Sequence, residues 1–170
     1  DLQGMDEEAC FFARMTVASY GERERGHTGN YFSYLWGPLG AARVGPDATA
    51  AFLREQRWYF DLARSFDGSF PYQGGAGMEG GEHKYGKWDY TAAFVLASAL
   101  PRQKLYMTGR GVDEGNVLVG DELEDAIAAG RGFDNWGMVS ELYAAMNSRE
   151  LLRLLESWSP AVRSRAAEAL

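Results

Sequence analysis

Residues 26–40 read GHTGNYFSYLWGPLG and residues 80–101 read GGEHKYGKWDYTAAFVLASALP. In each stretch a glycine-containing loop leads into a segment, 30–43 or 89–100, that is apolar on every side. A helix that is apolar all round has to be buried, whereas an amphipathic helix can face solvent on one side. The stretch between them, 46–66, is amphipathic. This alternation predicts two layers of helices, with the apolar helices inside.

Other helix signals surround these segments. Acids at 6–8 precede an apolar stretch that stops at Gly21. Strand signals are confined to Leu105–Thr108 and Val117–Val119, each long enough for one arm of a short hairpin. The sequence therefore predicts an all-α fold. On segment 46–66 the periodicity predicts one common buried face, made of Phe52, Tyr59, Leu62, Ala63 and Phe66.

Composition and charge exclude several classes of protein. Among 170 residues there are 24 acids against 17 lysines and arginines, a formal net charge of −7. Nucleic-acid interfaces are basic, so we expect no nucleic-acid partner. The single cysteine excludes an internal disulfide framework and a cysteine-cluster zinc site. No apolar run reaches the roughly 18 residues of a membrane helix. Since neither an initiator methionine nor a signal-like stretch is present, we expect the sequence to belong to a longer chain.

The glycines divide the chain. Twenty of the 21 lie in residues 21–137, and residues 138–170 contain none. In that last part Asn147 followed by Glu150 predicts a capping box, and Ser159-Pro160 predicts the start of another helix. We therefore expect three parts: a helical segment over 1–110, a connecting segment over 111–137, and a helical hairpin over 138–170.

Together with QRWYFDLARSFDGSFPYQ (56–73), the two opening stretches resemble the α/α-toroid superfamily, which includes triterpene cyclases, protein prenyltransferase β-subunits and helical-barrel carbohydrate enzymes. The nearest resemblance is to an uncharacterised bacterial toroid family. LLRLLESWSPAVRSRAAEAL (151–170) is similar to HEAT repeats, which follow the toroid in that family. The resemblance implies a partial toroid over 1–110 and the start of a HEAT-like repeat over 138–170.

Two departures from the motifs of isoprenoid enzymes argue against an isoprenoid activity. Prenyltransferase β-subunits bind zinc through an aspartate, a nearby cysteine and a later histidine, but Asp89 is followed by Tyr90-Thr91-Ala92 with no cysteine near. The aspartate-rich acid motif of hopene-type cyclases is also absent. Glu79, Glu82, His83 and Asp89 lack the spacing of a metal-ligand motif. We therefore expect neither a metal nor another cofactor.

His27, Asn30 and Tyr31 stand at the start of the first apolar segment. Inner-helix N-termini of a toroid can face its cavity, where backbone N–H groups favour an anion. His27 would serve as a general acid or base, with Asn30 and Tyr31 binding substrate. The alternative is that Thr28 or Asn30 caps the helix and that His27 bonds a loop carbonyl.

Asp89 holds the corresponding place at the second apolar segment, directly after Trp88. It would be a catalytic carboxylate, with Trp88, Glu82 and His83 in the binding site. The alternative is an aspartate that caps its own helix. GxGxxG at 75–80 lacks the strand before it and the helix after it that a dinucleotide-binding fingerprint requires.

The expected function is thus that of a carbohydrate-active hydrolase or lyase with a small molecule or glycan in the toroid cavity. The net negative charge favours a neutral substrate over a strongly anionic one. The alternative is a non-catalytic scaffold that binds a peptide or glycan and meets a protein partner through the HEAT-like tail. An isoprenoid enzyme is the third and weakest possibility.

Overall fold

The structure is a computed structural model that describes residues 3–21, 31–71, 89–104, 111–112, 114–132 and 141–170. Within these ranges the chain is mostly helical and contains no strand, which confirms the all-α prediction. Its α-helices are α1 (Asp6–Val17), α2 (Tyr31–Ala41), α3 (Pro46–Glu55), α4 (Arg57–Ala63), α5 (Thr91–Ala99), α6 (Gly120–Ala129), α7 (Glu141–Ala144), α8 (Ser148–Leu154) and α9 (Pro160–Ala169). Short 3₁₀ turns, η2 (Ala42–Val44), η3 (Leu100–Arg102) and η4 (Glu114–Asn116), adjoin them.

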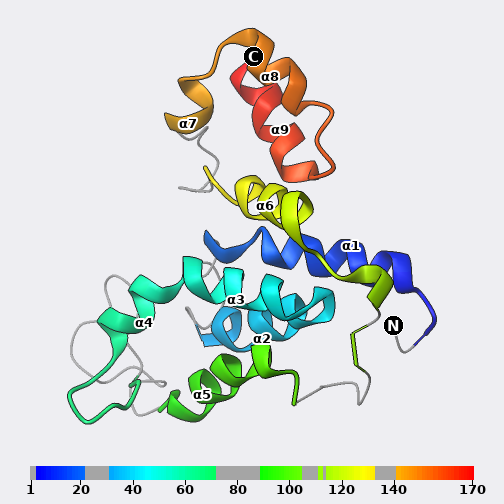
Figure 1. Cartoon of the computed structure of the whole chain (residues 1–170). Coiled ribbons are helices and arrows are strands. Elements are labelled where there is room, and N and C mark those ends of the chain that lie inside the picture. Colours follow the sequence, from blue (N-terminus) through cyan, green and yellow to red (C-terminus); the bar gives the residue numbers. More distant parts are fainter. Residues whose placement is uncertain (1–2, 22–30, 72–88, 105–110, 113, 133–140) are drawn as a thin grey trace.

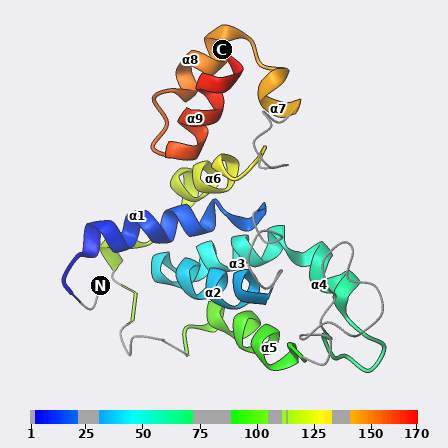
Figure 2. The ribbon, with the colours of Figure 1, turned by 180° about the vertical axis from the view of Figure 1, so that it is seen from behind.

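The helices form a stack that Figures 1 and 2 show from opposite sides. Helices α2 and α3 lie in the middle, with α5 on one side and α1 on the other. Helix α6 lies across α1, and the group α7–α9 lies beyond α6 at the far end. No helix in the described part of the chain is long and apolar enough to cross a membrane.

The main core lies where α1, α2, α3 and α6 meet. Its buried residues are Ala13, Val17, Ala41, Val44, Ala48, Ala51, Phe52, Leu118, Ala126 and Ile127. Many of these are small, so the helices have to approach closely to fill the space. Helices α1, α3 and α6 each contribute two or more of these residues, whereas α2 contributes Ala41.

Helix α2 approaches two neighbours through its glycines. A Cβ at Gly37 would lie 2.7 Å from Cζ of Phe52, and a Cβ at Gly40 would lie 2.9 Å from Cγ2 of Thr16. The first contact is with α3 and the second with α1. Glycine inside α2 is therefore a packing requirement, and the helix continues through Pro38 to Ala41.

The predicted helix over 46–66 is divided at Gln56, and its expected common face is only partly buried. Phe52 and Ala63 are buried, but Leu62 is 78% exposed and Phe66 is fully exposed. The chain turns at Gln56, so α4 takes a new direction, and it ends at Ala63 before Phe66 is reached. The prediction of one common buried face over the whole of 46–66 was therefore wrong, because it assumed a single continuous helix.

Two further expectations differ from the structure. Helix α5 buries Ala93, Phe94 and Ala97 on one side, whereas Val95 is 60% and Leu96 50% exposed. The expectation that this helix is buried all round was wrong for the described residues. Val117–Val119 is not a strand: it is a single extended connection whose Leu118 N–H donates to the carbonyl of Val44.

Helices α8 and α9 begin where their capping residues predict. The Asn147 side chain accepts from the N–H groups of Arg149 and Glu150, while the Glu150 carboxylate accepts from the Asn147 N–H. Ser159 caps α9 through the N–H of Val162, with Pro160 in the first turn. Leu151 and Val162 are buried in this group.

Candidate functional site

Asp89 lies immediately before α5, on an exposed turn. Its Oδ1 accepts the backbone N–H of Thr91 at 2.7 Å, and its backbone forms an isolated antiparallel bridge with Pro71. The Thr91 hydroxyl in turn accepts the N–H of Phe70 at 2.9 Å. The N-cap residue of α5 is Tyr90, and no side chain caps this helix, so Asp89 closes a turn one residue before the cap. The contacts of Asp89 with Pro71 and of Thr91 with Phe70 tie the start of α5 to the segment that follows α4.

The Asp89 carboxyl is held in its ionised form. Hydrogen bonds from the Thr91 hydroxyl and then from the Thr91 N–H lower the pKa of Asp89 below its usual range. A carboxylate with a lowered pKa is a poor general acid, since it carries no proton near neutral pH. It can still serve as a base, a nucleophile or a polar contact.

The other predicted site residues cannot be joined to Asp89. His27, Asn30, Glu82, His83 and Trp88 lie outside the described residues. Tyr31 is the first residue of α2, and its side chain also lies outside them. The catalytic roles expected of His27 and Asp89 stay predictions.

An aromatic cluster joins α2, α4 and α5. The rings of Tyr34 and Tyr59 stack with centroids 4.4 Å apart. Phe94 meets Phe70 at 4.7 Å and Phe60 at 4.9 Å, both edge to face. Such pairs add specific geometry to apolar burial, so the cluster fixes α4 and α5 relative to one another. It also makes the wall of a groove.

This groove runs between α3–α4 and the second half of α5. Its volume is about 600 Å³. The residues that line it are Leu53, Arg54, Arg57, Phe60, Phe70, Phe94, Val95, Ser98, Ala99 and Arg102. We call it the aromatic–arginine groove. Asp89 does not line it, because it stands at the other end of α5.

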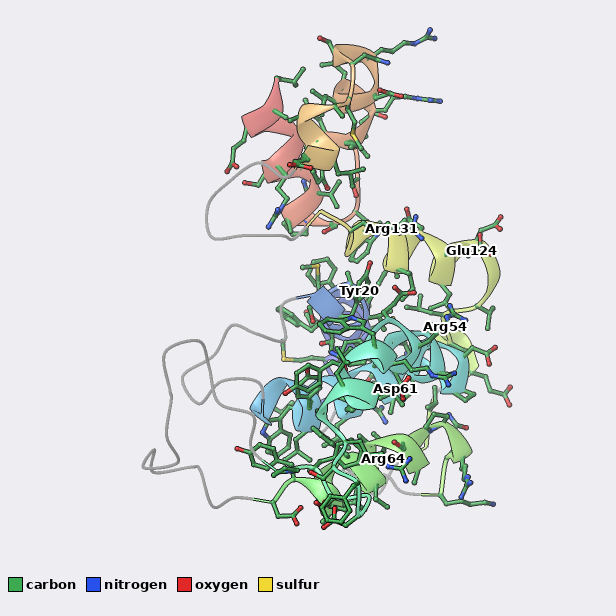
Figure 3. All side chains as sticks on the ribbon, turned by 90° about the vertical axis from the view of Figure 1, so that its left-hand side faces the viewer. Tyr20, Arg54, Asp61, Arg64, Glu124 and Arg131 are labelled. Atoms are coloured by element: carbon green, nitrogen blue, oxygen red, sulfur yellow. The ribbon has the colours of Figure 1, made fainter. Side chains whose placement is uncertain are left out.

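The charged side chains of the groove are all cationic. Arg57 forms an exposed ion pair with Asp61, with Nε and Oδ2 3.3 Å apart. In the described part of the chain, Arg54 and Arg102 make no hydrogen bond or ion pair. Figure 3 labels Arg54, Asp61 and Arg64, which follow one another along α3, α4 and the turn after α4. A chain of net charge −7 thus gathers three arginines around one apolar concavity.

The groove has the properties of a binding site more than those of a reaction centre. Ligand sites are typically apolar concavities of some hundreds of cubic ångströms with a few polar groups. None of the lining residues is a carboxylate or an imidazole. Among the described residues no three histidine, cysteine or acidic side chains gather as metal ligands would.

Sequence reasoning missed this groove. The helical period places Arg54 and Arg57 away from the apolar face of segment 46–66, and Arg102 follows α5 almost fifty residues later. The available signal was a set of three arginines flanking aromatic segments, but nothing in one sequence brings α3 and η3 together. The structure does so by packing the end of α5 against α3.

The chain was compared with known protein families, curated proteins and solved structures. A family model described as a domain of unknown function, DUF6288, matches residues 1–109. No curated protein and no solved structure matches the chain.

Proposed function

The chain belongs to the DUF6288 family, and we propose that it is a non-catalytic ligand-binding module built on part of an α/α toroid. Its ligand would lie in the aromatic–arginine groove. The HEAT-like tail over 138–170 would be a second, protein-binding part of the same module.

The packing of α2 and α5 supports a toroid. Both helices are rich in apolar residues, and they contact one another although they are separated by fifty residues. Helix α3 packs against α2 as well, and it also meets η3 at the end of α5. An inner layer formed by α2 and α5, with α3–α4 outside, is the arrangement a toroid segment would have. The exposed Leu96 would then face the next inner helix of a complete ring.

The tail has the elements of a helical repeat. Helices α8 and α9 pack against one another through Leu151, Leu154 and Ala166, joined by a turn that Ser159 caps. Repeat proteins bury their apolar faces between successive hairpins. The exposed Leu152 and Leu170 would provide part of such a face.

The single observation that carries the binding proposal is the lining of the groove. It combines the Phe60, Phe70 and Phe94 wall with three guanidinium groups, and it contains no acid–base pair. Such a lining can hold an apolar group and an anion together, but it offers no proton acceptor for catalysis.

The fluorescent probe 8-anilinonaphthalene-1-sulfonate tests this, because it is both aromatic and anionic. We expect the protein to bind it in the groove and Ser98→Trp to abolish binding, because Ser98 lines the concavity. Ala92→Trp is the matched control, on an exposed position of α5 that does not line the groove. Equal binding by the two variants would refute the groove as the site.

A carbohydrate hydrolase or lyase remains a second proposal, favoured by the exposed and ionised Asp89. A base or nucleophile in such an enzyme has to be unprotonated and reachable by substrate. The test is turnover of neutral and uronic-acid glycans by the protein, by His27→Ala and by Asp89→Asn. Turnover by the unmodified protein that is lost in both variants would establish this activity and overturn the non-catalytic proposal. If the unmodified protein turns over none of these glycans, the hydrolase or lyase proposal is refuted.

A further inference from the structure

We propose that the ligand of the aromatic–arginine groove is an acidic peptide segment that inserts one large apolar side chain. This inference rests on the proposed binding function and names the chemistry of its partner. The groove combines an opening of about 600 Å³ with charged side chains of one sign.

The charge of the groove selects an acidic partner. Arg54 and Arg102 are exposed and lack a carboxylate partner among the described residues, so a ligand anion displaces no internal bond at either. Arg57 shares its charge with Asp61. Guanidinium groups bind carboxylates through two parallel hydrogen bonds, and this makes arginine well suited to glutamate and aspartate side chains.

The apolar wall calls for a hydrophobic anchor. Phe60, Phe70 and Phe94 meet edge to face, and Leu53, Val95 and Ala99 extend the same surface. Val95 is 60% exposed, so a ligand side chain placed there would remove apolar area from water. A leucine or phenylalanine flanked by two acidic residues would place its side chain against this apolar wall and its neighbouring carboxylates near the arginines.

The same lining argues against a glycan. Sugar hydroxyls need many donors and acceptors, but Ser98 is the one uncharged polar side chain among the lining residues. A phosphate-rich polymer is a poorer match than a peptide. Its charges would have to be met along an extended basic surface, whereas the chain carries a net charge of −7.

Isothermal titration calorimetry with three end-blocked pentapeptides tests the proposal. The first alternates glutamate with leucine, the second replaces each glutamate with glutamine, and the third replaces each leucine with serine. We expect measurable binding of the first alone at 0.1 M salt, and a clear loss of affinity at 0.5 M, because salt screens exposed charge pairs.

The variants assign the binding to the groove. Arg54→Gln combined with Arg102→Gln should weaken binding of the first peptide at least fivefold. The control Arg149→Gln with Arg153→Gln makes the same change of net charge on exposed positions of α8, far from the groove, and should leave binding unchanged. Equal weakening by both pairs would overturn the proposal, since only the overall charge would then matter.

The outcomes separate the two proposals. If 8-anilinonaphthalene-1-sulfonate binds the groove but the glutamine peptide binds as well as the glutamate peptide, the binding function stands and the acidic partner is refuted. Tighter binding of an oligogalacturonate or a single-stranded oligonucleotide of equal charge would refute it likewise. If no probe binds in a way that Ser98→Trp abolishes, both proposals fail.

Discussion

The guanidinium carbon of Arg14 lies 4.1 Å from the centroid of the Trp158 ring, and both side chains donate to the same carboxylate oxygen of Asp125. The three residues come from α1, the α8–α9 connection and α6. Phe11 adds an edge-to-face contact with the same indole. A single carboxylate therefore joins the tail to the two helices beneath it.

Replacing Trp158 should loosen this junction. We expect Trp158→Ala to lower the free energy of unfolding by about 2 kcal/mol, below the range for a fully buried tryptophan because the ring is half-buried. Trp158→Phe keeps an aromatic ring over Arg14 but loses the N–H, so its free energy of unfolding should lie between those of the unmodified protein and Trp158→Ala. Urea unfolding measures both. The control Trp36→Ala removes a tryptophan that is 52% exposed, and an equal loss there would contradict the junction.

Gly37→Ala should destabilise the protein, although glycine-to-alanine changes inside helices usually stabilise. Glycine to alanine inside a helix normally stabilises by about 1 kcal/mol. Here the new Cβ would meet the buried ring of Phe52, so we expect a net loss of about 1–3 kcal/mol in thermal or urea unfolding. In a Phe52→Leu background the loss should shrink, because the clashing ring atoms are gone. Gly111→Ala, where a Cβ meets nothing, should be close to neutral.

The capping box of α8 should depend on the Asn147 side chain. Asn147→Ala removes the acceptor of two N–H groups and should cost about 1 kcal/mol in the unfolding of the tail. Asn147→Asp retains the acceptor and should cost much less. Chemical denaturation of both variants checks this, and indistinguishable midpoints would show that the cap does not stabilise the fold.

Asp89 should titrate below an ordinary aspartate, as followed by the carboxyl signal in ¹³C NMR. Because its pKa is lowered by folding, Asp89 stabilises the fold above the usual aspartate value of about 4, and this contribution is lost as the pH falls through the lowered pKa. Thr91→Val removes the hydroxyl, so the pKa of Asp89 should rise. Thr91→Ser should keep it low. The lowered pKa of Asp67, which depends mainly on Ser69, serves as the internal control.

Local signals predicted most of the helices. Pro46, Asn147 and Ser159 mark helix starts that the structure has at the same places, since caps act within one turn of the chain. The turn at Gln56 was missed because its cause is tertiary. The Gln56 side chain is buried and donates to the carbonyl of Tyr20, a contact with a distant segment.

The candidate site was less predictable than the helices. The capping alternative for Asp89 could be stated from sequence, because it concerns neighbouring residues. The aromatic–arginine groove could not, since it depends on α5 packing beside α3 and α4. Tyr20 and Arg131, which lie near one another where α1 meets α6 (Figure 3), are a similar long-range pair. Such pairs follow from packing and leave no local pattern.

The uncovered side of α5 has a consequence for handling the protein in solution. Val95 and Leu96 present aliphatic surface, and repulsion between the net negative charges of different molecules keeps such surfaces apart at neutral pH. That repulsion vanishes near the isoelectric point of about 4.9. Precipitation should therefore be greatest close to pH 5, and a glutamate at position 96 should delay it.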